Sequence, residues 1–174
     1  TVLGQIAGGL TAQGLPALTS VYAPAVLSTG DNITLTANGQ LESINLGGLT
    51  TAGGGLVVAS NPNLSSLTLE TLETVAGDLT VSDSVVTALT LPALLSTVAS
   101  MSVTNNQALT SVTAELLTSV GATLTLHNNG DLSDLQMPLL TSADSILITQ
   151  NPKLPDWAIL DLNQAPNGEL AGKV

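Results

Sequence analysis

Residues 61–83 read NPNLSSLTLETLETVAGDLTVSD. The same order of Asn, Leu, Ser and Thr returns in NNQALTSVTAELLTSVGATLTLHNN at residues 105–129 and in NNGDLSDLQMPLLTSADSILITQNP at residues 128–152. Self-similarity at a fixed period of about 20–50 residues is the signature of a repeat architecture. These stretches therefore predict a fold that is built by stacking one repeat on the next.

Each repeat begins at an apolar residue, and these starts follow one another at a nearly constant step. Within a repeat, apolar residues stand two apart with polar residues between them, which is the periodicity of a β-strand and not of a helix. Gly and Pro fall between these runs, where turns are expected. The repeats start near Leu10, Ile33, Leu56, Leu79, Met101, Leu124 and Ile146.

The period predicts an all-β fold, a right-handed β-solenoid of about seven coils of 22–23 residues with a short C-terminal capping helix. Successive coils should stack about 4.8 Å apart. We expect the solenoid to span residues 1–162 and the polar C-terminal tail to span residues 163–174. Pro155 and Trp157 should open the capping helix, which continues through the amphipathic stretch from Ala158 to Leu162. The N-terminal end has no comparable cover, so we expect further sequence or self-association there.

The composition excludes several classes of function. Lys and Arg number 2 against 13 acidic residues, which gives a net charge of -11. Nucleic-acid binding needs clustered cations, so it is excluded, and contact with anionic membranes is disfavoured for the same reason. The apolar runs are too short to insert into a membrane. The chain has no Cys and therefore no disulfides.

An Asn stands at the same place in most repeats, shortly after the first predicted strand, and two of these Asn residues precede Pro. A stacked Asn at a corner can bond its amide to the backbone of neighbouring coils and so satisfy turn groups that no strand pairs. In the shorter fourth repeat, Asp83 stands near this place. The predicted structural ladder consists of Asn38, Asn61, Asn106, Asn129 and Asn151.

The repeat units at residues 61–83 and 105–129 resemble the receptor L-domain, a relative of leucine-rich repeats that occurs in receptor ectodomains and microbial cell-surface proteins. The resemblance covers roughly residues 8–160, and the closing segment NPKLPDWAILDLNQ resembles the way these domains end. Receptor members carry cysteines, which this chain lacks, and aromatic contact residues, of which it has one Trp and one Tyr. The resemblance therefore implies the microbial cell-surface variety and says nothing about a ligand.

The sequence offers little for catalysis. The single His, His127, is expected on an outward position without an acid beside it, and no cofactor motif is present. Asp131, Asp134 and Asp156 fall near one turn on adjacent coils, where a glycosidase pair or a Ca²⁺ site is an alternative. Lys153 should form a surface ion pair with Asp131. We expect no enzymatic activity, no cofactor and no metal.

The outward residues of the first strand in each repeat form a Thr-rich array that is nearly free of charge. It resembles the Thr-x-Thr face of insect antifreeze solenoids, although Val57, Ala59, His127 and Leu147 interrupt it, and β-propensity alone also favours Thr here. Ice binding is therefore the alternative function. The candidate binding face consists of Thr34, Thr36, Thr80, Ser82, Ser102, Thr104, Thr125 and Thr149.

Two sequons place candidate glycosylation sites at Asn32 and Asn63. Together with the acidic surface, they favour a secreted or cell-surface protein. The prediction is a non-catalytic structural or adhesion module that self-assembles into an extracellular filament or layer. Its expected partners are further copies of itself, other extracellular proteins or glycans, with no nucleic acid and no membrane insertion.

Overall fold

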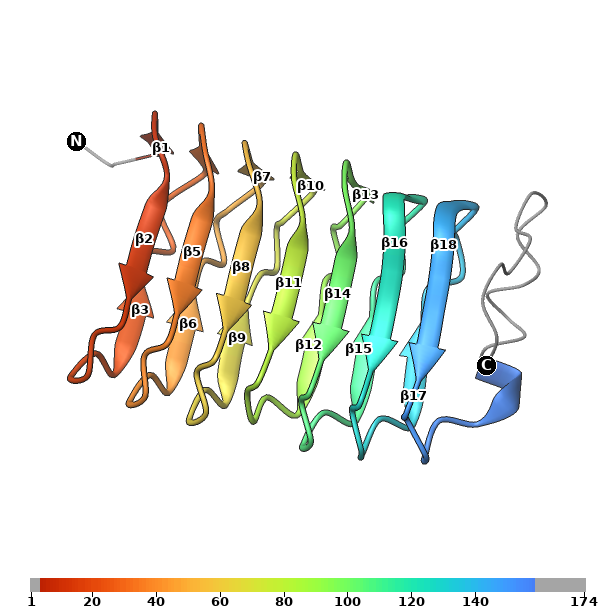
Figure 1. Ribbon diagram of the computed structural model, residues 1–174. Helices are drawn as coiled ribbons and strands as arrows, with labels where there is room; N and C mark the ends of the chain where they lie inside the picture. Colours follow the sequence, from red (N-terminus) through yellow and green to blue (C-terminus); the bar gives the residue numbers. More distant parts are fainter. Residues whose placement is uncertain (1–3, 159–174) are drawn as a thin grey trace.

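Short strands alternate with tight turns along the chain, because Thr, Ser, Val, Leu and Ile occupy the strand positions and Gly, Pro, Asn and Asp stand between them. The computed structural model describes residues 4–158 and shows these strands wound into a β-solenoid (Figure 1). Every strand pair in this range is parallel. The predicted all-β solenoid is confirmed.

Most coils contribute one strand to each of three sides. The side that we call the long face contains β2 (Leu10–Gln13), β5 (Ile33–Thr36), β8 (Leu56–Ala59), β11 (Leu79–Ser82) and β14 (Met101–Thr104). The short face contains β1 (Gln5–Ile6), β4 (Ser28–Thr29), β7 (Thr51–Ala52), β10 (Thr74–Val75) and β13 (Ser96–Thr97). The back face contains β3 (Ser20–Tyr22), β6 (Ser43–Asn45), β9 (Ser66–Thr68), β12 (Ala88–Thr90), β15 (Ser111–Thr113) and β17 (Asp134–Gln136).

The last two coils join the short and long faces. Strands β16 (Ser119–His127) and β18 (Ser142–Thr149) run from one face into the other without a break, and they connect the two sets of strands into one sheet. The strand register shifts between Val120 and Thr123, where β18 has one residue fewer than β16. This shift accounts for the shorter step between Leu124 and Ile146.

The register stacks equivalent residues of successive coils in columns. The first inner column of the long face runs through Leu10, Ile33, Leu56, Leu79, Met101, Leu124 and Ile146. Two residues further on, a second column runs through Ala12, Leu35, Val58, Val81, Val103, Leu126 and Ile148. Seven passes, and thus six full turns from first to last, follow from these pairings.

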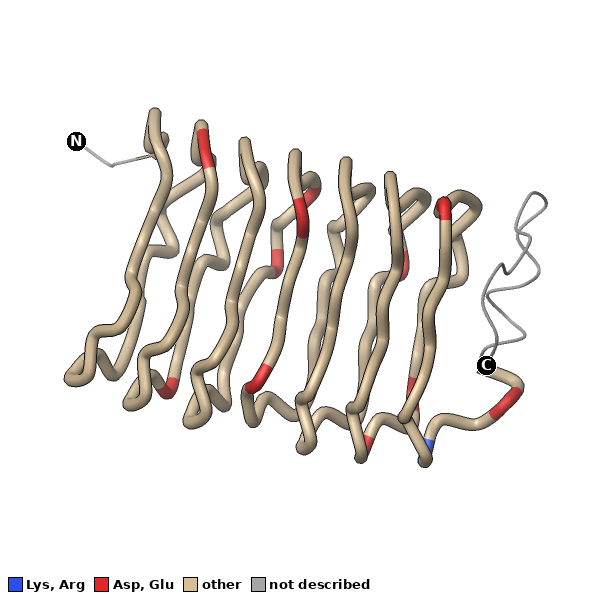
Figure 2. Tube along the Cα trace, in the orientation of Figure 1, with Lys and Arg blue, Asp and Glu red and all other residues tan. Residues whose placement is uncertain are grey.

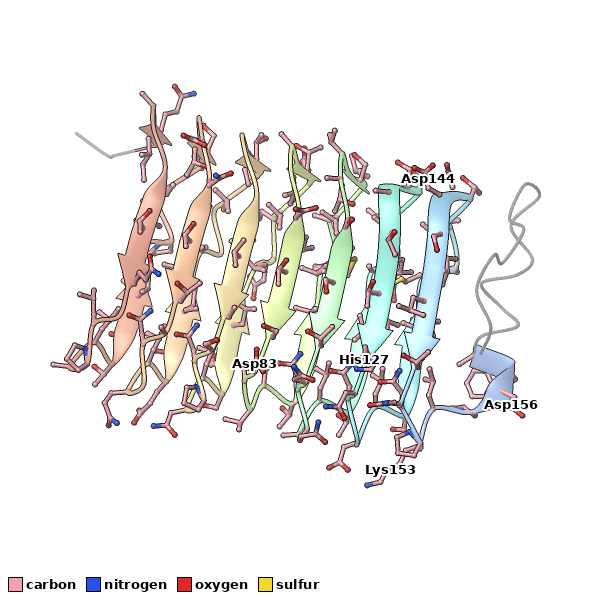
Figure 3. All side chains as sticks on the ribbon, in the orientation of Figure 1. Asp83, His127, Asp144, Lys153 and Asp156 are labelled. Atoms are coloured by element: carbon pink, nitrogen blue, oxygen red, sulfur yellow. The ribbon has the colours of Figure 1, made fainter. Side chains whose placement is uncertain are left out.

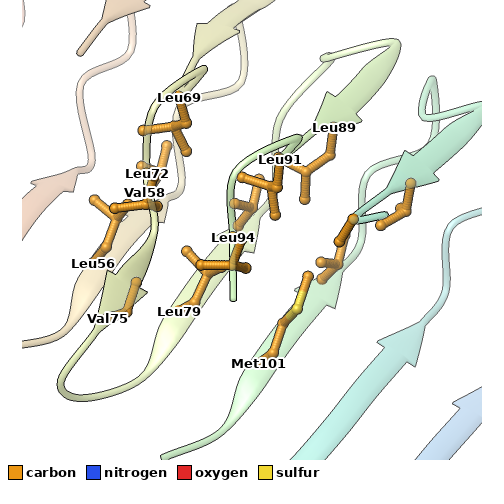
Figure 4. Packing of buried hydrophobic residues seen from close by; sticks show 14 of the residues in the cluster. Leu56, Val58, Leu69, Leu72, Val75, Leu79, Leu89, Leu91, Leu94 and Met101 are labelled. Atoms are coloured by element: carbon orange, nitrogen blue, oxygen red, sulfur yellow. The ribbon is translucent and has the colours of Figure 1, made fainter. Parts of the chain in front are cut away.

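The core is a continuous stack of aliphatic side chains. Figure 4 shows Leu56, Val58 and Leu72 of one coil packed together and Leu79 packed with Leu94 in the next coil, and all five are fully buried. Neighbouring coils lie one strand spacing apart, so each side chain contacts its equivalent above and below. In the described part of the chain, Leu, Ile, Val, Ala and Met side chains fill this narrow interior and no aromatic side chain is buried in it.

The fourth coil contains a one-residue deletion. Strand β11 follows β8 at the full step of the repeat, whereas the back-face core residue Val86 follows its equivalent, Leu64, at a step that is shorter by one. The deletion therefore falls in the turn before β12. At this coil the back face divides into two separate sheets, β3-β6-β9 and β12-β15-β17.

A helix begins at Asp156 at the C-terminal end of the rod. Leu154 and Ala158 are buried there, while Trp157 is 57% exposed. The remainder of the predicted cap, residues 159–162, and the predicted tail, residues 163–174, lie outside the described residues. Within residues 4–158, no helix is long and apolar enough to span a membrane.

Candidate functional site

The asparagine ladder is a column inside the corner that follows the long face. Asn129 is fully buried; its Oδ1 accepts a hydrogen bond from the Asn106 backbone N–H at 3.0 Å, and its Nδ2 donates one to the Val103 carbonyl at 2.9 Å. Both partners belong to the preceding coil. One side chain therefore satisfies a turn N–H and a strand carbonyl that are otherwise left without partners.

All five predicted ladder residues make this same pair of hydrogen bonds to the preceding coil. The column begins at Leu15, whose backbone N–H donates to Asn38 Oδ1 at 3.0 Å. No buried side-chain nitrogen or oxygen in the described part of the chain lacks a partner. The ladder thus joins each coil to the one before it, except at the fourth coil.

In the fourth coil, the ladder position belongs to Ser84 and not to Asp83. Ser84 stands in the column between Asn61 and Asn106, and both its N–H and its hydroxyl donate to Asn106 Oδ1, at 3.1 and 2.7 Å. Ser84 takes this place because the one-residue deletion falls after the ladder position. The step from Asn61 to Ser84 therefore keeps the full length of the repeat. Serine is too short to reproduce the asparagine bonds to the coil before it.

The residue before each ladder position has a positive φ. These left-handed turn residues are Gly14, Ala37, Ser60, Asp83, Asn105, Asn128 and Gln150, with φ between 53° and 63°. The conformation costs free energy for any residue other than Gly, and Asn tolerates it best. Two exposed side-chain hydrogen bonds join three of these turns. Asn105 Nδ2 donates to Asp83 Oδ1 at 3.1 Å, and Asn128 Nδ2 donates to Asn105 Oδ1 at 2.9 Å.

The candidate binding face lies on the long face as two outward columns. The first column runs Thr11, Thr34, Val57, Thr80, Ser102, Thr125 and Leu147, and the second runs Gln13, Thr36, Ala59, Ser82, Thr104, His127 and Thr149. Most of the predicted residues are half-buried, but Ser82 is only 7% exposed. Its short side chain is recessed beside Thr104 of the next coil, so it is not part of an accessible face.

A more complete hydroxyl column runs along the short face, and the sequence analysis did not identify it. It consists of Ser28, Thr51, Thr74, Ser96, Ser119 and Ser142, which pair from coil to coil without interruption. We call it the hydroxyl column. The signal in the sequence is a Ser or Thr at the same place late in each of these repeats. Four of these strands have only two residues, which is too short to show the alternation of inward and outward side chains that marks a strand in the sequence.

Two of the candidate catalytic groups, His127 and Asp134, have uncharged polar partners. His127 Nδ1 lies 2.8 Å from the hydroxyl of Thr149, and Asp134 accepts a hydrogen bond from Gln136 at 2.9 Å. His127 and Lys153 lie at one corner of the rod and Asp144 at the opposite corner (Figure 3). Lys153 pairs with Asp131 at 2.6 Å, as predicted. Within residues 4–158, no group of three His, Cys, Asp or Glu side chains could hold a metal ion.

Both sequon asparagines lie on exposed turns, and each makes a hydrogen bond across coils. Asn32 Oδ1 accepts one from the Gly55 N–H at 2.7 Å, and Asn63 Nδ2 donates one to the Gly39 carbonyl at 2.8 Å. Asn32 belongs to a second set of side chains that tie coil to coil at the corner between the short and long faces. Asp78 does the same, because its Oδ1 accepts from the Ser100 N–H at 2.9 Å.

No protein-family model matches this chain, and neither a curated protein nor a solved structure matches it at a significant level. Its function is therefore inferred from its own residues and from their arrangement on the solenoid.

Proposed function

We propose that this chain is a non-catalytic structural or adhesion module of the extracellular or cell-surface space. One observation carries the proposal: every coil is joined to the next by parallel backbone ladders, and every junction except that between the third and fourth coils also has the bonds of the asparagine ladder. A rod that is bonded internally at every step holds its outer side chains at fixed spacings. Such a scaffold presents a repeated surface to a partner and needs no moving part.

The outer surface supports a partner that is neither strongly charged nor strongly apolar. The hydroxyl column and the outward columns of the long face consist mainly of Ser and Thr, which donate and accept hydrogen bonds. Partners of this chemistry are glycans, the polar surfaces of other extracellular proteins, and further copies of the chain. The acidic surface charge favours solubility and weakens nonspecific association.

The extracellular setting rests on the two sequons, the acidic composition and the resemblance to receptor L-domains of the microbial cell-surface type. In this proposal Asn32 and Asn63 carry glycans where the host attaches them. Both side chains lie on exposed turns, as such modification requires.

A glycan array and intact microbial cell walls test the adhesion proposal. The wild-type chain is compared with two triple variants, Thr34→Ala/Thr80→Ala/Thr125→Ala on the long face and Thr51→Ala/Thr74→Ala/Ser119→Ala in the hydroxyl column. The matched control, Ser43→Ala/Ser66→Ala/Ser111→Ala, removes three hydroxyls from the back face.

We expect wild-type chain and control to bind a surface ligand and one triple variant to lose binding, with the same thermal midpoint for all four proteins. Failure of the wild-type chain to bind any ligand would refute the adhesive role. Ice crystals that are shaped by the wild-type chain, and no longer by the long-face variant, would replace adhesion with the ice-binding alternative.

A further inference from the structure

Two asparagines of the ladder stand directly before a glycine. Asn38 precedes Gly39 and Asn129 precedes Gly130, and both asparagine side chains are fully buried. Asn is a thermolabile residue, and its amide is most reactive when the next backbone nitrogen is freely accessible. Glycine leaves that nitrogen unshielded because it has no Cβ. The ladder therefore places two reactive asparagines in the interior of the rod.

The reaction that such a pair undergoes is deamidation through a cyclic imide. The backbone nitrogen of Gly130 attacks Cγ of Asn129 and forms the N–Cγ bond. The Cγ–Nδ2 bond breaks, and the proton of the glycine nitrogen leaves with Nδ2 as ammonia. Water then opens the imide at either carbonyl, adding its hydroxyl to the carbon and its remaining proton to the nitrogen. The product is aspartate, or isoaspartate with the side-chain CH₂ in the main chain, and nothing is oxidised or reduced.

The folded rod protects both asparagines. Oδ1 of Asn129 accepts a hydrogen bond from the Asn106 N–H at 3.0 Å, and its Nδ2 donates one to the Val103 carbonyl at 2.9 Å. Asn38 makes the equivalent bonds at 3.0 and 2.9 Å. Ring closure expels Nδ2 and so removes one of these bonds, and water has no access to a side chain that is fully buried. The reaction therefore requires the coil to open, as it does in unfolding.

Neither product fits the ladder. A carboxylate in place of the Asn129 amide still accepts from the Asn106 N–H, but it has no hydrogen to donate to the Val103 carbonyl. It also places a charge in the interior, which is costly without a partner of opposite charge. No Asp or Glu of the described residues is buried, and Figure 2 shows where they lie along the rod. Isoaspartate lengthens the main chain at the corner after the long face, which disturbs the pairing with the preceding coil.

The other three ladder asparagines have less reactive neighbours, so the ladder contains its own controls. Asn61 and Asn151 are each followed by proline, whose nitrogen carries no proton, so ring closure cannot give a neutral imide. Asn106 is followed by Gln107, whose side chain shields the backbone nitrogen. All five share the same pair of bonds to the preceding coil, so differences between them report the next residue.

We propose that Asn38 and Asn129 are latent deamidation sites, which the folded rod protects and unfolding exposes, so that a chain that stays unfolded loses the ability to refold. The sites belong to the ladder and not to the outer faces, so their test does not depend on what those faces bind. The consequence is kinetic stability: the lifetime of the rod depends on how seldom it unfolds.

Peptide mapping by mass spectrometry tests the protection. The wild-type chain is kept at mildly alkaline pH in buffer and in guanidinium chloride, and each asparagine is followed on its own peptide, separately from Asn167, which lies outside the described residues. Deamidation of Asn38 and Asn129 should be at least about tenfold faster in denaturant, because the folded chain opens only rarely. Asn61 and Asn151 should stay intact. Equal rates in the two solutions, or intact Asn38 and Asn129 in denaturant, would overturn the proposal.

Refolding tests the consequence. Samples are diluted from denaturant after increasing times, and folded chains are separated by size-exclusion chromatography and mapped. The fraction that regains the native circular dichroism spectrum should fall with time, and the folded chains should be depleted in both products at Asn38 and Asn129. Full recovery of chains that carry these products would show that the fold tolerates them and would overturn the proposal.

Gly39→Pro provides the matched variant. Proline stands at the equivalent place in the coils on either side, as Pro16 and Pro62, and a Cβ at Gly39 meets nothing within 4 Å. In denaturant the variant should leave Asn38 intact while Asn129 is modified as in the wild type, a result that needs no folded chain. Deamidation of Asn38 at the wild-type rate would show that the glycine nitrogen is not the attacking group, and the proposal would be wrong.

Discussion

The replacement Asn106→Ala tests whether the asparagine ladder stabilises the solenoid. Asn106 is completely buried and bonded on both sides of its amide: Oδ1 accepts from the Ser84 N–H at 3.1 Å, and Nδ2 donates to the Val81 carbonyl at 3.0 Å. Alanine removes both bonds and leaves two buried backbone groups without partners. The Ser84 hydroxyl also loses its acceptor, but it can rotate toward another.

The cost follows from those two stranded groups. Each buried and unsatisfied group costs about 1–3 kcal/mol, so the variant should lose about 3 kcal/mol of unfolding free energy. For a chain of this size, the melting temperature should fall by about 6–12 °C. Chemical denaturation followed by circular dichroism, together with a thermal melt, measures both quantities.

Two further variants make the result interpretable. Asn63→Ala removes an exposed amide with one bond to Gly39 and should change the unfolding free energy by less than about 0.5 kcal/mol. Asn106→Asp keeps the acceptor oxygen but loses the donor to Val81, so it should also destabilise the fold. If Asn106→Ala unfolds at the same denaturant concentration as the wild type, the ladder does not carry the stability assigned to it.

Three more outcomes are expected. Gly121→Ala should cost about 2 kcal/mol or more, because its Cβ would overlap the Val98 carbonyl oxygen, whereas Gly39→Ala meets nothing within 4 Å and should be nearly neutral; equal denaturation midpoints would contradict the close packing of this corner. Ala37→Gly should raise the unfolding free energy by about 0.5 kcal/mol, because glycine relieves a φ of 57°, and a lower midpoint would show that this turn is unstrained. The wild-type chain should release no reducing ends from a polysaccharide panel, and release that Asp134→Asn abolishes would establish a glycosidase.

The sequence by itself was sufficient for the period and for the inward or outward direction of most strand residues. In a solenoid each coil contacts only its neighbours, so one repeat determines the environment of the next. Leu56 and Leu79 stand at the same place in successive repeats and are paired in neighbouring strands, and this pairing does not depend on residues in more distant coils. The same locality placed the ladder asparagines in one column.

The details of the short coil needed the tertiary structure. Each ladder asparagine stands five residues after the start of its repeat, and the same count from Leu79 gives Ser84, so the prediction of Asp83 departed from the period. The three-dimensional pairing places Ser84 in the column and shows that Asp83 takes the left-handed turn. The burial of Ser82 has the same origin, since it depends on the side chain above it and not on strand alternation.

The tertiary structure also determined which side chains line up on each face of the rod. The hydroxyl column joins residues from six coils, and in four of them the strand has only two residues, which is too short to show a period of its own. Local repetition determines how coils stack, whereas the register between coils determines which outward residues line up on one face.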